Sequence, residues 1–244
     1  MEAAPPDAAK FAAALCEMEA EIHWDRLEPV YVEGDAAGFF SPEQLEAQRD
    51  AGLLFASDMA TELAGHAGGS SLYLGAGVAE LAPALFECSA LGREVRWVTL
   101  PGPEASELQR AFAVVGERLG ERLPAVDTAP LKPSPEPFCD HLWLVSVLSD
   151  PVAFPALHRS VYEKKAPRAA ALDADKRRAR ELLRAAFTHL TPPALLHTTN
   201  EELPLVEQAA VERGGRLVLE ELGRLSPIVG DVVRRGRWLA APGT

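Results

Sequence analysis

The residues with the clearest chemical meaning lie in the stretch SSLYLGAGVAELAP, residues 70–83. A short apolar run leads into two glycines, Gly75 and Gly77, and then into a segment with helical periodicity. Glycine lets the backbone come close to a ligand because no side chain is there to collide with it. Ala79 supplies a third small residue after the turn. This order of strand, glycine turn and helix predicts a site for a nucleotide-like cofactor.

The motifs of several other kinds of site are absent from the sequence or incomplete. A nicotinamide-dinucleotide fingerprint needs a glycine where Glu80 stands and an acid at the end of the next strand, and both are missing. The sequence has neither the GK[ST] of a P-loop nor the G-x-S-x-G of a serine hydrolase. The six histidines and three cysteines show no metal-ligand or redox spacing. We therefore expect no metal site and interpret the histidines as surface or supporting residues.

Alternating strands and helices must position the glycine turn, and the rest of the chain has that pattern. Apolar runs predict strands at 71–77, 94–100, 123–130, 141–150, 195–200, 216–222 and 230–240. Helical periodicity predicts helices at 6–22, 41–65, 78–91, 106–120, 152–190 with a break near Pro167, and 203–215. Ser41 is the expected N-cap of the second of these helices, and residues 22–35 are expected to be irregular.

This pattern indicates an α/β fold. Strands that alternate with helices form a doubly wound, mainly parallel, Rossmann-like sheet, here of about seven strands. The last two strands have only a turn between them, which favours an antiparallel hairpin at the C-terminus. The N-terminal helices precede the first strand of this sheet.

The order of motifs over residues 70–240 resembles the class I S-adenosylmethionine-dependent methyltransferases. That resemblance implies a seven-stranded sheet with a final antiparallel hairpin, and S-adenosylmethionine as the cofactor. It divides the chain into an N-terminal helical cap or lid, residues 1–66, and a methyltransferase-type domain, residues 67–244. Ligands of open α/β sheets bind at the C-terminal ends of the strands, so the site residues should gather at one rim.

The resemblance also implies which residues contact the cofactor, and two of the usual acids are replaced. Tyr73 stands where the family often has an acid. The ribose-binding acid at the end of the second strand is replaced by Thr99 or Leu100, and Glu104 is the nearest carboxylate. Asp127 falls where the family has an acid that binds the adenine amino group. The full set of expected cofactor contacts is Tyr73, Gly75, Gly77, Ala79, Thr99, Glu104, Asp127 and Ser146.

Candidates for the methyl-transfer chemistry are fewer. His141 and Asp150, at the two ends of the fourth predicted strand, could serve as a general base. His23, Trp24 and Tyr31 are candidate substrate-facing residues in the N-terminal segment. Their structural alternative is an amphipathic connector with its aromatic side chains packed on the sheet.

The charge is uneven along the chain. The formal net charge of −12 argues against a general nucleic-acid binder. Residues 1–66 hold 14 acidic and 3 basic side chains, whereas residues 158–184 hold 9 basic and 4 acidic ones. The basic stretch is either a solvated helix face or a contact surface for an anionic substrate or acidic partner. With no apolar run near the roughly 20 residues of a membrane span and no signal-peptide pattern, we expect no membrane association and a cytoplasmic protein.

Two functions are compatible with these residues. In the first, the protein is a methyltransferase that acts on a small molecule or a protein. In the second, it is a degenerate relative that keeps the fold, has lost the cofactor or the chemistry, and serves as a binding or assembly subunit. The replaced acids at Tyr73 and Thr99 favour the second function, and the small residues of the turn together with Asp127 favour the first.

Overall fold

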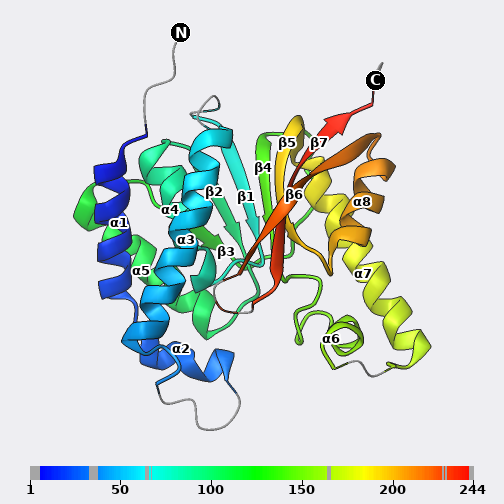
Figure 1. Ribbon diagram of the computed structural model, residues 1–244, viewed down its shortest axis with the longest axis horizontal. Helices are drawn as coiled ribbons and strands as arrows, with labels where there is room; N and C mark the ends of the chain where they lie inside the picture. The colour runs from blue at the N-terminus through cyan, green and yellow to red at the C-terminus, as the bar shows by residue number, and fades with distance from the viewer. Residues whose placement is uncertain are drawn as a thin grey trace. The chain divides into compact units, whose positions relative to one another are not determined.

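A computed structural model of the 244-residue chain describes residues 6–32, 38–63, 66, 68–163, 166–226, 228 and 230–241 (Figure 1). The strands are β1 (Ser70–Leu74), β2 (Glu94–Val98), β3 (Ala125–Asp127), β4 (Cys139–Leu144), β5 (Leu190–Thr199), β6 (Gly215–Leu225) and β7 (Val232–Ala240). The helices are α1 (Ala8–Glu21), α2 (Trp24–Tyr31), α3 (Pro42–Leu63), α4 (Leu81–Leu85), α5 (Pro103–Leu119), α6 (Pro155–Val161), α7 (Ala169–Thr188) and α8 (Leu203–Glu212). Two further helical turns, η2 (Val78–Glu80) and η3 (Phe86–Ala90), flank α4.

The sheet has the order β3-β2-β1-β4-β5-β7-β6. The pairs β1–β2, β2–β3 and β4–β5 are parallel, whereas β7 pairs antiparallel with both β5 and β6. The predicted α/β class, the seven strands and the antiparallel C-terminal hairpin are confirmed. The hairpin places β7 inside the sheet and β6 at its edge.

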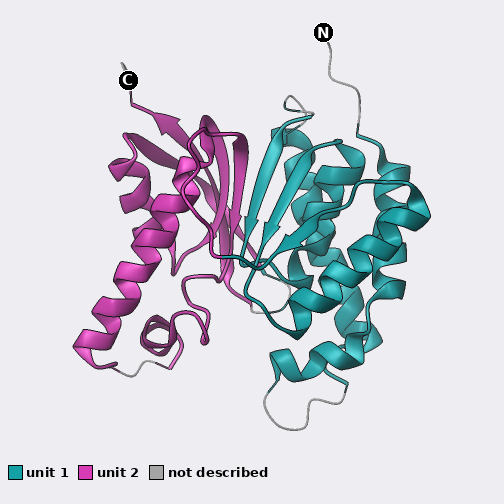
Figure 2. Ribbon diagram, turned by 180° about the vertical axis from the view of Figure 1, so that it is seen from behind, with its two compact units in different colours: residues 1–129, 226–228 teal, residues 130–225, 229–244 magenta. Residues whose placement is uncertain are grey.

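The chain divides into two compact units, coloured separately in Figure 2. Unit 1 is residues 1–129 with 226–228, and unit 2 is residues 130–225 with 229–244. Unit 1 holds α1–α5 and β1–β3, and unit 2 holds α6–α8 and β4–β7. The N-terminal helices thus belong to the same unit as the glycine turn. Their predicted role as a cap or lid stays a prediction.

Within unit 1, α1 is fixed to α5 by ion pairs. Arg110 and Arg118 of α5 both bind Glu21 of α1, and Arg118 also binds Glu17 at 2.5 Å. Apolar side chains on the inner face of α1, among them Phe11 and Met18, are buried. Two of the acidic side chains of the N-terminal segment, Glu17 and Glu21, are therefore paired with arginines inside the unit.

Two segments differ from the sequence-based expectation. The predicted irregular stretch contains α2, which includes Pro29, a residue that normally disfavours a helix interior because it lacks an N–H group. The segment predicted as a helix over 78–91 is helical over 78–90, but it consists of three consecutive types of helix, η2, α4 and the π-turn η3. At its end, Leu91 N–H bonds Phe86 O at 3.2 Å. The predicted cap at Ser41 is confirmed, since its hydroxyl accepts from Gln44 N–H at 3.3 Å.

In the described part of the chain, no helix is long and apolar enough to cross a membrane. The same residues contain no group of three or more His, Cys, Asp or Glu side chains that could hold a metal ion.

Candidate functional site

The glycine turn after β1 is fixed by backbone hydrogen bonds. Gly75 has φ +67°, a conformation that side chains disfavour, and its N–H donates to Val98 O of β2. Ala76 O accepts from the indole N–H of Trp97 at 3.0 Å. Gly77 N–H donates to Glu80 Oε2 at 2.8 Å. The turn is thus held from the neighbouring strand and from the first helical turn that follows it.

Gly77 meets a different requirement, because its backbone conformation is ordinary (φ −129°). A Cβ atom at this position would lie 2.5 Å from Glu104 Oε1 and 3.0 Å from Glu104 Oε2. A larger residue at Gly77 would therefore have to move the Glu104 carboxylate, which lies directly against the backbone.

Glu104 reaches the turn from the first helical turn of α5. Its Oε1 atom accepts from Val78 N–H at 2.8 Å and from the hydroxyl of Tyr31. Burial raises the pKa of Glu104, although the two hydrogen bonds act in the opposite direction. Burial and the neighbouring Glu104 carboxylate raise the pKa of Tyr31 well above its usual value, so the phenol remains the donor. The structure therefore brings together Gly77, Glu104 and Tyr31 from three separate elements.

Tyr73 has a different place from the predicted one. Its side chain has no exposed surface, and its hydroxyl donates to Glu87 Oε1 at 2.7 Å. The ring stacks on Trp97 with centroids 5.9 Å apart. Glu87 also pairs with Arg93 at 2.8 Å, and both of these side chains are fully buried. Tyr73 is consequently part of a buried polar cluster in the core, and we do not include it among the candidate cofactor contacts.

Thr99 and Asp127 lie side by side at the ends of β2 and β3. Thr99 N–H donates to Asp127 O at 3.0 Å, and Thr99 is half-buried. The Asp127 side chain is 42% exposed; its Oδ1 accepts from Ala129 N–H at 2.9 Å and its Oδ2 lies 3.5 Å from an Arg96 nitrogen. Part of the Asp127 carboxylate therefore faces solvent at the C-terminal ends of these strands.

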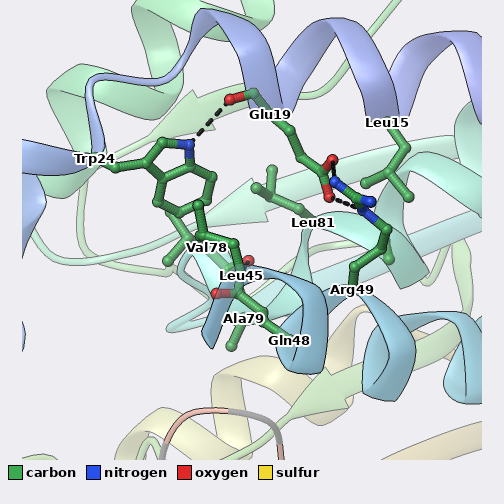
Figure 3. A pocket seen from close by; sticks show the side chains of 10 residues that line it. Leu15, Glu19, Trp24, Leu45, Gln48, Arg49, Val78, Ala79 and Leu81 are labelled. Atoms are coloured by element: carbon green, nitrogen blue, oxygen red, sulfur yellow. Dashed lines mark hydrogen bonds and ion pairs between the residues drawn. The ribbon is translucent and has the colours of Figure 1, made fainter. Parts of the chain in front are cut away.

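Ala79 and Trp24 line a pocket between α1, α3 and the turn η2 (Figure 3). Trp24 Nε1 donates to Glu19 O at 2.9 Å, and Gln48 Nε2 donates to Val78 O at 2.7 Å. Glu19 also forms an ion pair with Arg49 across the pocket. Trp24, predicted to face the substrate, is thus engaged with the backbone of the preceding helix.

His23, also predicted to face the substrate, caps the start of α2. Its backbone N–H and its ring Nδ1 both bond Glu107 Oε1, at 2.8 and 2.9 Å. The ring is still 43% exposed. His23 anchors α2 to α5, and its predicted contact with the substrate stays a prediction.

The remaining sequence candidates lie in unit 2. His141 is completely buried in β4, where its Nε2 lies 2.9 Å from Nδ1 of His197. Asp150 closes a local turn by accepting from Val152 N–H at 2.8 Å and from Ala153 N–H at 2.6 Å. Both candidate bases thus have structural partners.

Ser146 follows β4 with φ +59°, a conformation that is rare for a residue other than glycine. Its hydroxyl donates to Asp231 Oδ2 at 2.7 Å, and the hydroxyl of Tyr162 donates to the same oxygen. Ser146 N–H donates to Glu202 Oε2 at 3.2 Å. The segment after β4 is therefore held by two buried carboxylates.

Sequence reasoning missed Asp231, Tyr162 and Glu202. Glu202 accepts five hydrogen bonds, from the N–H groups of Ser146, Leu148 and Thr199 and from the hydroxyls of Thr198 and Thr199. A signal was available for Glu202, since the polar run 198–202 directly follows the apolar part of a predicted strand.

The basic stretch 158–184 is partly neutralised. Arg178 pairs with Asp175 at 2.5 Å, and Arg184 pairs with Glu212 at 2.9 Å. Lys164 and Lys165 lie outside the described residues. A contact with an anionic substrate or acidic partner at this stretch stays a prediction.

Solved structures are similar to this chain across nearly its whole length. One is the magnesium protoporphyrin IX methyltransferase of Synechocystis PCC 6803 with bound S-adenosylmethionine, at 14% identity and a TM-score of 0.52. The alignment covers 94% of this chain and 97% of that one. The fold is that of the class I S-adenosylmethionine-dependent methyltransferases.

A second similar structure is the 1,6-didemethyltoxoflavin-N1-methyltransferase of Burkholderia thailandensis, at 16% identity and a TM-score of 0.45. The alignment covers 97% of this chain and 91% of that one. The sequence matches no protein-family model, and the comparison with curated proteins gives no significant match. The similarity to the Synechocystis structure confirms the predicted resemblance at the level of the fold.

Proposed function

We propose that this protein binds S-adenosylmethionine at the glycine turn of unit 1 and transfers its methyl group to a small-molecule or protein acceptor. The observation that supports this most is the bare backbone of Gly77, where a Cβ atom would lie 2.5 Å from Glu104 Oε1. The Glu104 carboxylate lies against this backbone, and a carboxylate suits a ligand that carries hydroxyl groups because it accepts hydrogen bonds from them.

The residues of unit 1 fit the cofactor group by group. Glu104 would accept the ribose hydroxyls in place of the usual strand-end acid, with Thr99 as a weaker acceptor. Asp127 would accept the adenine amino group, and Gly75 and Gly77 would allow the close approach of the backbone. S-adenosylmethionine, when bound, supplies a methyl group on a sulfonium centre that a nucleophile can displace. The protein's main task would be to orient the acceptor and exclude water.

Calorimetric titration with S-adenosylmethionine and S-adenosylhomocysteine tests the proposal. Asp127→Ala should weaken binding by roughly tenfold to a hundredfold, since one hydrogen bond to a charged group is lost. Asp7→Ala is a matched control, because Asp7 also accepts one backbone N–H, from Lys10 at 3.1 Å in the same unit, but lies at the start of α1. Absence of heat up to about 1 mM ligand, a concentration that detects even a weak site, would refute the proposal if the protein is folded.

A second function rests on the same site. Glu104 Oε1 already accepts from the Tyr31 hydroxyl and from Val78 N–H, and Tyr73 replaces the acid that the family often carries. A protein that has lost the cofactor would keep such internal contacts and could act as a binding or assembly subunit. In that case neither ligand binds, and a partner must be sought through the basic stretch 158–184.

A further inference from the structure

Helix α2 is held at both of its ends by acidic side chains of α5. At its start, His23 bonds Glu107 through its backbone N–H at 2.8 Å and through its ring at 2.9 Å. At its end, Tyr31 donates its hydroxyl to Glu104. Glu104 and Glu107 lie one helical turn apart, so α2 spans a short section of α5.

The two attachments differ in strength. Glu107 also binds Arg110 at 2.6 Å, and hydrogen bonds from Arg110 and His23 outweigh burial and lower its pKa to about 2. The attachment at the start of α2 is therefore an ionised, multiply bonded group. The attachment at the end of α2 is a single hydroxyl on a single oxygen.

That oxygen, Oε1, is the one of the two Glu104 oxygens that lies nearer to Gly77. Glu104 Oε1 accepts from both Val78 N–H and the Tyr31 hydroxyl, and a carboxylate oxygen has two lone pairs to offer. A third donor in the plane of the carboxylate therefore has to replace one of the two. The amide of Val78 belongs to the turn itself, so Tyr31 is the donor that can leave.

The ring of Tyr31 is also held in place by neighbouring aromatic side chains. It stacks on Phe39 with centroids 5.9 Å apart and meets the edge of Phe40 at 5.3 Å. Phe40 in turn contacts Trp24 at 5.0 Å. These ring contacts hold the Tyr31 side chain beside Glu104. Its hydroxyl therefore stays bonded to Oε1 as long as the end of α2 keeps these contacts.

We propose that Tyr31 is an internal competitor for the cofactor site, in which its phenol hydroxyl takes the hydrogen-bond position that a ribose hydroxyl of the cofactor would use. This inference rests on the proposed function. Phenol and ribose hydroxyls are the same kind of donor. A ribose that gives one hydroxyl to each oxygen of Glu104 needs Oε1, the oxygen that the Tyr31 hydroxyl already binds. Cofactor binding then displaces Tyr31 and releases the end of α2, whereas His23 and Glu107 keep its start attached.

The variant Tyr31→Phe tests this inference because it removes the hydroxyl and keeps the ring. Titration with S-adenosylhomocysteine should show binding about threefold to tenfold tighter than in the wild type, since one competing hydrogen bond is gone. Thr188→Val is the control: Thr188 also donates its hydroxyl, to Ala185 O at 2.6 Å, but lies at the end of α7 in unit 2. Its affinity for the ligand should equal that of the wild type.

Hydrogen exchange supplies a readout that does not depend on affinity. When S-adenosylhomocysteine binds the wild type, the Val32 amide, which bonds Glu28 O at 3.1 Å at the end of α2, should exchange faster. The His23 amide should stay as protected as before. Equal or weaker binding by Tyr31→Phe, with the wild type binding normally, overturns the competitor role and leaves the cofactor site intact. Absence of binding in both proteins overturns the proposed function and the competitor role together.

Discussion

Glu202 allows a prediction with a calculable size. Its side chain is buried and accepts five hydrogen bonds after β5. Burial raises its pKa to about 7 from a usual value of 4.5, although the hydrogen bonds from Leu148 and Thr199 act against the rise. At roughly 1.4 kcal/mol per pKa unit, this shift corresponds to about 3 kcal/mol of unfolding free energy.

The unfolding free energy decreases as the pH rises, because the folded protein prefers the neutral form of Glu202. The contribution is fully present below the unfolded pKa of 4.5 and is lost as the pH rises through about 7. The variant Glu202→Gln has no titrating group at this position. Any loss of unfolding free energy that the substitution itself causes does not depend on pH. The stability of the wild type relative to this variant should therefore fall by about 3 kcal/mol between about pH 4 and pH 8.

Urea denaturation followed by circular dichroism measures this difference at each pH. Glu201→Gln, at an exposed neighbour, controls for the removal of one carboxylate. If Glu202→Gln does not fold, Thr199→Val replaces it, because loss of one hydroxyl donor should move the transition of Glu202 to higher pH. Wild type and Glu202→Gln curves that run parallel across the whole pH range would refute the reasoning.

Two further predictions concern unit 1. Gly77→Ala should weaken binding of S-adenosylhomocysteine by at least about tenfold in calorimetry, because the new Cβ would lie 2.5 Å from Glu104 Oε1 and displace the carboxylate. Unchanged affinity would show that Glu104 does not bind the ligand. Arg93→Met should lower the unfolding free energy by about 3–5 kcal/mol in urea denaturation, since it leaves Glu87 charged and fully buried. Arg122→Met, which breaks an exposed ion pair, should cost less than about 1 kcal/mol, and similar losses in both variants would contradict the argument.

Most of the fold could be predicted from the sequence because hydrophobic periodicity and glycine turns act locally. All seven predicted strands form, although β4 ends at Leu144 instead of residue 150 and β5 begins at Leu190 instead of residue 195. The cap at Ser41 is also observed. The misjudged segments depended on distant contacts. Helix α2 forms in spite of Pro29 because His23 and Tyr31 bind α5 at its two ends.

The candidate site was predictable only in part, for the same reason. The glycines and Asp127 lie in recognisable local patterns at the ends of strands. The contacts of Glu104 with Tyr31 and with Val78 span 73 and 26 residues of sequence, and no short sequence pattern predicts them. Tyr73 shows the converse, since its position in the motif suggested a cofactor contact and its hydroxyl binds Glu87 in the core.

The buried pairing of Tyr73 with Glu87 has a consequence for detecting related chains. A sequence search that requires an acid at the end of β1 would not detect this chain, because Tyr73 replaces that acid. It would also miss any relative in which a tyrosine of β1 binds a glutamate of the following helical segment, as Tyr73 binds Glu87. Because the buried side chains of Tyr73, Glu87 and Arg93 bind one another, they should be inherited or lost as a set. A tyrosine in β1 that co-varies with a glutamate 14 residues later and an arginine 6 residues beyond that would identify such chains.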